Sequence, residues 1–266
     1  MTPAWWDAEL VAHERRTFDI AVLTVKPAQP YPYRPGQSVS VEVASRPRAR
    51  RYYSPANAPR RDGGIDLHVR RVPGGKLSSA LVDEVDKGDV VRLGPPVGNR
   101  LVLPDEEQGD LLLVAGGTGL APLKAFTEQV ATREHDGHPP RKVTLVVGAR
   151  SIREFYDVDD LLALEEQLPG LDVILAVEQE HARGAMAALL PPRARVGLGT
   201  AAEVVMQYGP WVGRRSFVCG SDDMVASTVR SLWEAGHQAE LIHYEGFEGL
   251  GGDMHGVVDA GGRYQQ

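Results

Sequence analysis

Three glycines stand at the end of a continuous apolar run in the stretch AGGTGLAP, residues 115–122. The run before them, 110–115, is typical of a buried strand, and helical spacing follows the glycines. Glycines let a chain turn tightly and approach a pyrophosphate, and the helix start then offers unpaired N–H groups to the anion. The pattern is not a full G-x-G-x-x-G, because Ala121 and Pro122 follow Gly119. By itself it describes either a nucleotide-binding loop or a tight strand-to-helix turn.

Two shorter motifs in the first hundred residues combine cations, rings and glycines. Arg51–Ser54 reads RYYS, so a guanidinium and a hydroxyl flank aromatic rings, a set that suits a ring system carrying a phosphate. The same four residues also fit an edge strand whose tyrosines pack on a barrel. Further along, Pro73–Ser79 reads PGGKLSS, a glycine turn running into a helix start that could hold a phosphate on main-chain N–H groups. Each motif alone is weak.

The residues around RYYS predict short strands. Apolar and polar residues alternate, or β-branched residues dominate, in 18–26, 37–43, 65–72 and 88–93. Stretches rich in proline and glycine separate them, and only 77–85 has helical spacing. Short alternating strands at close spacing favour a small antiparallel barrel, which we expect to have six strands.

A different pattern begins after Pro104. Fully apolar segments alternate with helical stretches, and these segments are 110–115, 142–147, 171–177, 216–218 and 240–244. Such strands predict a parallel sheet covered by helices on both faces. We therefore expect an α+β protein of two domains. These are an antiparallel β-barrel over residues 1–104 and a Rossmann-like α/β domain with a five-stranded parallel sheet over 105–247, followed by a flexible glycine-rich tail over 248–266.

Composition argues against several classes of protein. The net charge of −7 at pH 7 does not suit a nucleic-acid partner, although arginines concentrate in the first 71 residues and would suit a polyanionic small molecule. The single cysteine, Cys219, rules out an internal disulfide or a cysteine-ligated iron–sulfur cluster. The sequence shows no signal peptide and no apolar run long enough for a bilayer, which predicts a cytoplasmic protein. His135 and His138 lie in a polar loop, so we expect no metal site there.

Six segments in order resemble the ferredoxin–NADP reductase superfamily, with a match from about Trp6 to Phe247: RYYS, HVRRVPGGKLSS, GPPVGN, LLLVAGGTGLAP, FVCGSDDMV and HYEGF. The stretches WWDAEL, YYSPANAP and HYEGF are most similar to the reductase domain of flavohaemoglobins and to reductases of bacterial multicomponent oxygenases. The resemblance implies a flavoprotein that binds FAD on the barrel and NADH or NADPH on the α/β domain. Hydride would pass from the nicotinamide to FAD, and single electrons would then leave for an acceptor.

The resemblance also implies roles for individual residues. On the barrel, the residues implied to bind FAD are Arg51, Tyr52, Tyr53, Ser54, His68, Val69, Arg70, Gly75, Lys76, Leu77 and Ser78. Arg51 would bind the pyrophosphate, Tyr53 would stack on the isoalloxazine, and Ser54 would hydrogen-bond near flavin N5. On the α/β domain, the residues implied to line the nicotinamide cofactor or the flavin face are Gly116, Gly117, Thr118, Gly119, Arg150, Cys219, Gly220, Met224, Glu245 and Phe247. Ser54, Cys219 and Glu245 are the candidate catalytic residues.

The choice of coenzyme rests on two opposed observations. Arg150 and Ser151 stand where the adenosine ribose should lie and could hold a 2′-phosphate, which favours NADPH. The stretch GARSIREFYD is nevertheless similar to the corresponding stretch of reductases that use NADH, and we expect NADH. A nucleophilic role for Cys219 is not expected, because no motif places a base beside it.

The electron acceptor is not identified by the sequence. Relatives of this pair of domains usually carry a globin or a plant-type iron–sulfur module, so we expect the acceptor to be a separate protein or a missing part of a longer chain. Candidates are a globin, a ferredoxin or an oxygenase component. Two alternatives are a free-flavin reductase and a non-catalytic nucleotide-binding subunit. Intact RYYS and PGGKLSS motifs favour bound FAD over the first, and the presence of Ser54, Cys219 and Glu245 weighs against the second.

Overall fold

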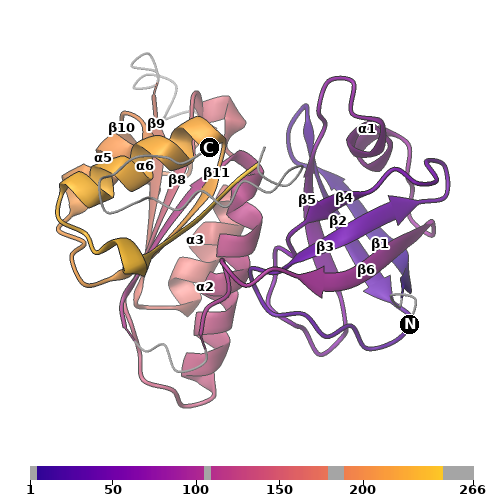
Figure 1. The fold of residues 1–266 in the computed structure, drawn as a ribbon, viewed down its shortest axis with the longest axis horizontal. Helices are drawn as coiled ribbons and strands as arrows, with labels where there is room; N and C mark the ends of the chain where they lie inside the picture. Colours follow the sequence, from indigo (N-terminus) through magenta and orange to yellow (C-terminus); the bar gives the residue numbers. More distant parts are fainter. Residues whose placement is uncertain (1–4, 105–108, 179–188, 248–266) are drawn as a thin grey trace.

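Two six-stranded sheets organise the chain, and in the computed structural model they form two units that lie side by side (Figure 1). The structure describes residues 5–104, 109–178 and 189–247. The predicted combination of an antiparallel barrel with a parallel α/β domain is confirmed.

The first sheet is antiparallel, with the strand order β4-β3-β6-β1-β2-β5. Its elements are β1 (Trp6–Arg15), β2 (Ile20–Pro27), β3 (Ser38–Val43), β4 (Arg51–Tyr53), β5 (Ile65–Arg70), α1 (Lys76–Asp83) and β6 (Val90–Val97). A bridge between Pro55, just after β4, and Leu67 on β5 joins the two edge strands, so the sheet is nearly closed as a barrel. Closure satisfies main-chain groups that an open edge would leave unpaired.

Strand β5 divides its side chains between the barrel core and the second domain. Ile65, Leu67 and Val69 belong to the core of the barrel, as the alternating pattern predicts. Asp66 and His68 point the other way and are nevertheless buried, because other parts of the chain cover this face. A face that alternation alone would assign to water is therefore part of an interface.

The second sheet is parallel, with the order β10-β9-β8-β7-β11-β12. Its strands are β7 (Leu111–Gly116), β8 (Val143–Ala149), β9 (Leu171–Val177), β10 (Arg195–Leu198), β11 (Arg215–Gly220) and β12 (Ile242–Gly246). Its helices are α2 (Leu120–His135), α3 (Val158–Gln167), α5 (Ala201–Tyr208) and α6 (Asp222–Glu234), with 3-10 turns η1 (Gly117–Gly119), η2 (Ile152–Glu154) and η3 (Ala239–Leu241).

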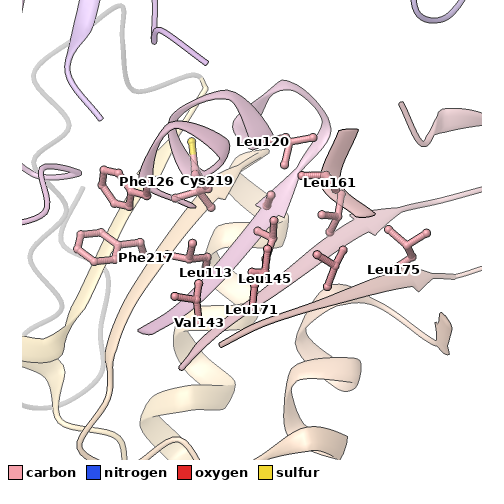
Figure 2. Close-up of a cluster of buried hydrophobic side chains, with 14 of the residues drawn as sticks. Leu113, Leu120, Phe126, Val143, Leu145, Leu161, Leu171, Leu175, Phe217 and Cys219 are labelled. Carbon is pink, nitrogen blue, oxygen red and sulfur yellow. The ribbon is translucent and has the colours of Figure 1, made fainter. Parts of the chain in front are cut away.

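Helices cover both faces of this sheet, which explains its unbroken apolar strands. On β7, Leu111 and Leu113 face a cluster that includes residues of α2 and α3, shown in Figure 2. Leu112 and Val114 face the opposite cluster, which α5 and α6 complete. Every side chain of the strand is therefore buried.

The parallel sheet has six strands, so the expectation of five was wrong. The additional strand, β10, has only four residues and pairs with β9 at the edge of the sheet. Its sequence, RVGL, contains a charge and a glycine and no continuous apolar run, because an edge strand needs less burial than a central one. The last strand also begins two residues later than expected, after the turn η3.

The connection between the sheets packs into the second domain. The first sheet ends at Val97 and the second begins at Leu111. Leu101 and Leu103, in the connection, join Ile20 of β2 in the cluster beneath α2 and α3. The predicted tail, 248–266, lies outside the described residues. Within the described part of the chain, no helix is both long and apolar enough to span a bilayer.

Candidate active site

Strand β4 carries the RYYS motif along the edge of the barrel. It pairs with β3, which places Tyr53 opposite Val39 and Arg51 opposite Val41. Arg51 and Tyr52 are exposed, while Tyr53 packs partly against the barrel core. Burial raises the pKa of Tyr53, so its phenol stays protonated. The strand therefore presents an exposed guanidinium, which donates to the Arg50 carbonyl over 2.8 Å, and an exposed ring beside a half-buried ring.

Ser54 follows this strand and is held from the neighbouring one. Its Oγ lies 3.2 Å from the Oγ of Ser38, which precedes Val39 on β3. A second hydroxyl thus restricts the orientation of Ser54, the position expected to hydrogen-bond near flavin N5.

The turn before α1 leaves a helix start open to an anion. Val72 to Gly75 form a turn in which the Gly75 N–H donates to the Val72 carbonyl over 2.9 Å, with Gly74 at φ +75°. Proline followed by a glycine of positive φ is the combination that a type II turn requires. Gly75 is the N-cap and no side chain caps the helix, so its first N–H groups are free to bind a phosphate.

Two of the residues expected beside this phosphate use their side chains elsewhere. The Ser78 hydroxyl accepts a hydrogen bond from the Val72 N–H and donates to the Gly75 carbonyl, and Leu77 is buried in the barrel core. Lys76 is exposed. The site therefore offers main-chain N–H groups and one lysine charge, which fits a pyrophosphate.

The side chains of His68 and Val69 do not point to a cofactor on the barrel surface. Val69 lies in the core, and His68 is buried against Tyr156 of the second domain, with 2.9 Å between His68 Nδ1 and the phenolic oxygen. Any contact that these two residues make with FAD would use their main chain. Arg70 is half-buried, and its guanidinium lies beside Gly117 and 3.3 Å from Asp19.

The glycine loop after β7 is packed too tightly for side chains. Gly117 has φ +54°, and a Cβ there would lie 3.2 Å from the Arg70 guanidinium. A Cβ on Gly119 would overlap the carbonyl oxygen of Cys219, and one on Gly116 would meet the sulfur of Met224. The loop leads into α2 through the turn η1, and the Leu120 N–H at the start of α2 already donates to the Gly117 and Thr118 carbonyls.

The ends of β11 and β12 lie beside this loop. Cys219 and Glu245 are neighbours in the pairing of these strands, and the Phe247 N–H donates to the Gly220 carbonyl over 3.1 Å. Met224 covers both Gly116 and Gly220. Loop and strand ends together occupy the carboxyl edge of the sheet between β7 and β11, where the strand order changes direction. Ligands of open α/β sheets bind at this point.

Burial controls the titration of both acidic groups in this corner. It raises the pKa of the Cys219 thiol, with a smaller contribution from the Glu245 charge, so the sulfur is a thiol within the apolar cluster of Figure 2. Burial also raises the pKa of Glu245, and the positive charge of Arg100 partly opposes this. A carboxyl with a raised pKa keeps its proton to a higher pH than a solvated one, whereas the buried thiol is inert as a nucleophile.

Comparison with known proteins agrees with this arrangement. Residues 6–101 match the family described as oxidoreductase FAD-binding domain, and residues 113–230 match the oxidoreductase NAD-binding domain. The reductase subunit of an aromatic O-demethylase from Amycolatopsis is 33% identical over 258 residues, which span 91% of this chain and 72% of the relative. The chain belongs to the ferredoxin–NADP reductase superfamily.

Other members of the superfamily support the same assignment. A ferredoxin–NAD(P)(+) reductase component of a naphthalene 1,2-dioxygenase/salicylate 5-hydroxylase system from Ralstonia is 31% identical, over 90% of this chain and 67% of the relative. The crystal structure of a cytochrome P450 reductase from Amycolatopsis superposes with a TM-score of 0.78 at 30% identity, over 92% of this chain and 70% of that one. The flavohaemoglobin-like FAD/NAD-binding domain of a Vibrio cholerae nitric oxide dioxygenase, at 21% identity and a TM-score of 0.73, supports the fold, over 91% of this chain and 98% of that one.

As a member of this superfamily, the protein is an FAD-dependent NAD(P)H oxidoreductase. Bound FAD supplies the chemistry, accepting two electrons as hydride and releasing them singly. The chain's own residues would bind and orient: the start of α1 has no capping side chain, so its N–H groups would hold a phosphate. The Arg70 guanidinium lies between the two domains against Gly117.

The residues expected to select the coenzyme lie at the carboxyl end of β8. Arg150 is exposed there and Ser151 is half-buried. An acidic residue, Glu178, directly follows the adjoining strand β9, and its N–H donates to the Ala149 carbonyl over 3.2 Å. Glu178 could not be predicted here from its place in the sequence, because only the pairing of β8 with β9 brings it beside Arg150.

Several arginines of the first 71 residues form ion pairs with acidic side chains of the barrel. Arg46 pairs with Glu84, Arg60 with Asp66, and Arg71 with Asp83. The arginine-rich stretch is thus partly a set of surface ion pairs. The described residues contain no group of three or more His, Cys, Asp or Glu placed to hold a metal ion.

Proposed function

We propose that this reductase takes hydride from NADH onto a tightly bound FAD and passes single electrons to a separate protein. The supporting observation is the meeting of three features: the glycine loop after β7, the ends of β11 and β12, and Arg70 from the barrel. Together they support a nicotinamide-binding edge beside β5, the barrel strand that follows the RYYS motif. Hydride transfer depends on such positioning, because the two reacting rings must be in near contact.

The proposed roles on the barrel follow from exposure and charge. Arg51 and the start of α1 with Gly75 and Lys76 would bind the pyrophosphate, and Tyr52 and Tyr53 would flank the flavin ring. Ser54, fixed by Ser38, would donate a hydrogen bond near N5. On the second domain, Thr118 and Gly119 would hold the coenzyme diphosphate, and Glu245 would approach the flavin face with Phe247.

NADH is the proposed donor because of the charge at the ends of β8 and β9. Ala149 pairs with Val177, so Arg150 and Glu178 follow from adjoining strand ends. A carboxylate can accept a hydrogen bond from a ribose 2′-hydroxyl and repels a 2′-phosphate. Glu178 thus offsets the attraction of Arg150 for NADPH.

The acceptor is proposed to be an oxygenase component, a ferredoxin or a globin. Relatives carry names of reductase components from oxygenase systems, including xylene/toluene monooxygenase and naphthalene 1,2-dioxygenase. A shared role would require a one-electron acceptor to dock where the flavin edge is open.

The test is a visible spectrum of the purified protein, then anaerobic addition of NADH and, separately, NADPH. A flavin spectrum that survives gel filtration and bleaches within seconds, faster with NADH, supports the proposal, and cytochrome c then serves as a stand-in one-electron acceptor. Flavin that separates from the protein yet is still reduced in its presence would identify a free-flavin reductase instead. A protein that takes up no FAD would refute flavin chemistry altogether.

A further inference from the structure

One buried carboxylate at the domain interface collects groups from three separate elements. Asp157, just before α3, has a fully buried side chain and a left-handed backbone with φ +56°. Its Oδ1 lies 3.1 Å from Nε of Arg16, which follows β1, and its Oδ2 lies 2.9 Å from Nζ of Lys124 on α2. His68 Nε2 from β5 lies 3.4 Å from the same Oδ2. A strained backbone of this kind persists only where its surroundings hold it.

The adjacent Tyr156 connects this cluster to the glycine loop. Its hydroxyl lies 2.9 Å from His68 Nδ1 and 3.4 Å from the Gly117 carbonyl oxygen. The ring stands edge-on to the imidazole, with 5.3 Å between centroids. One side chain of the second domain therefore touches both the barrel strand β5 and the loop proposed to hold the nicotinamide cofactor.

The imidazole in this chain of contacts is neutral. Burial, assisted by the Lys124 charge, lowers the pKa of His68 to about 3. A neutral imidazole carries one N–H, and Nε2, on the side of the Asp157 carboxylate, makes no hydrogen bond. The Nδ1–H therefore donates to the Tyr156 oxygen, and the Tyr156 hydroxyl donates in turn to the Gly117 carbonyl over 3.4 Å. Each side chain in this buried network is held in place by its neighbour in the network.

We propose that Tyr156 is a positioning residue for hydride transfer: with His68 and Asp157 it fixes the Gly117 loop at a set distance from strand β5, and so fixes the nicotinamide cofactor relative to the flavin. This inference rests on the proposed function and adds a residue that the sequence motifs did not single out. Its hydroxyl touches neither cofactor in this role and acts through Gly117 and His68.

The first test is Tyr156→Phe, with Tyr33→Phe as the matched control. Tyr33 is also buried and its hydroxyl also makes one short hydrogen bond, 2.8 Å to the Asn57 carbonyl, but both residues belong to the barrel. In stopped flow, Tyr156→Phe should lower the limiting rate of flavin reduction by about 10-fold while the dissociation constant for NADH changes by less than about 2-fold. Amide hydrogen exchange of residues 116–119, measured without coenzyme, should accelerate by about 10-fold in Tyr156→Phe only.

A double variant separates positioning from stability. Tyr156→Phe alone leaves His68 Nδ1 without a partner, whereas Tyr156→Phe with His68→Leu leaves no orphaned polar atom between them. Thermal stability should recover in the double variant, while slow flavin reduction and fast exchange of the loop persist. If reduction recovers together with stability, or if Tyr156→Phe behaves like Tyr33→Phe, the positioning role is wrong. Wild-type protein that shows no flavin reduction would instead refute the proposed function, and the exchange measurement would still test the contact.

Discussion

The two glycine-to-helix turns of this protein look alike in sequence and differ in their surroundings. Gly74 at the start of α1 has φ +75° and open space where a Cβ would stand. Gly119 at the start of α2 is pressed against the Cys219 carbonyl, and its neighbour Gly117 against Arg70. Both helices begin without a capping side chain. The turn before α1 is thus open to solvent and needs glycine for its backbone angle. The turn before α2 needs glycine because neighbouring strands and the barrel leave no room for a side chain.

The largest loss of stability and activity is expected at Gly119. In Gly119→Ala the new methyl would overlap the Cys219 carbonyl, so β7 and β11 must move apart, at a cost of about 1–3 kcal/mol for overpacking. We expect Tm to fall by about 5 °C or more and NADH-dependent flavin reduction to be nearly lost. Calorimetry and stopped flow measure the two effects. An unchanged Tm would show that the two strand ends can separate freely.

At the open turn, substitution should disturb binding more than packing. Gly74→Ala and the control Gly63→Ala both place a side chain at positive φ with nothing within contact range, so each should cost about 1–2 kcal/mol. Only Gly74→Ala should also weaken FAD binding, because only that turn precedes α1. Fluorescence titration of FAD into flavin-free protein measures the difference. Equal affinities in the two variants would remove the α1 start from the FAD site.

An intermediate effect should appear at the RYYS strand. Arg51→Ala should weaken FAD binding by about 10-fold through loss of a charged hydrogen bond, with the fold intact because Arg51 is exposed. The exposed Arg61 gives the control, since Arg61→Ala removes the same charge from a nearby loop. Full FAD occupancy in Arg51→Ala at limiting FAD would refute its role.

The folding stability of the protein should also depend on pH, through Glu245 on β12. Burial raises the pKa of Glu245 above that of the unfolded chain, so the protonated carboxyl favours the folded state. This stabilising contribution is complete below about pH 4.5 and is lost as the pH rises through the raised pKa. Between pH 5 and pH 8 the urea midpoint of wild type should therefore fall relative to that of Glu245→Gln. Parallel midpoints for the two proteins would show that the carboxyl ionises without cost.

The smallest effect is expected at Lys76. Its charge is exposed beside the start of α1, where one surface cation contributes about 0.5–1 kcal/mol to binding an anion. Lys76→Ala should raise the FAD dissociation constant about 2–5-fold at low salt, and the difference should shrink in 0.5 M salt, unlike that of Lys87→Ala. A salt-independent loss would point to packing of the lysine stem.

Local chemistry made much of the fold and the site predictable. The turn before α1 follows from Pro73 and Gly74, and β7 with its glycine loop follows from an apolar run ending in glycines. These signals work because the responsible residues are neighbours in the chain. Strand β10 was not predicted, because an edge strand of four residues has no such pattern.

The domain interface could not be predicted, because its partners are far apart in sequence. His68 alternates correctly as an outward residue of β5, and only the second domain makes that position buried. Asp157 reads as an ordinary acidic residue before a helix, and nothing local indicates that Arg16 and Lys124 neutralise it. The cofactor roles of His68 and the coenzyme choice at Arg150 stay predictions, since both depend on bound molecules.

Ile20 of the barrel sits in the same apolar cluster as Leu101, Leu103 and Phe126. A cluster shared in this way couples the melting of the two domains, since neither can lose its structure without exposing part of the other's interior. We expect a single calorimetric transition whose van't Hoff and calorimetric enthalpies agree. Dissecting the protein at the connection should then yield two fragments that each expose apolar surface and aggregate.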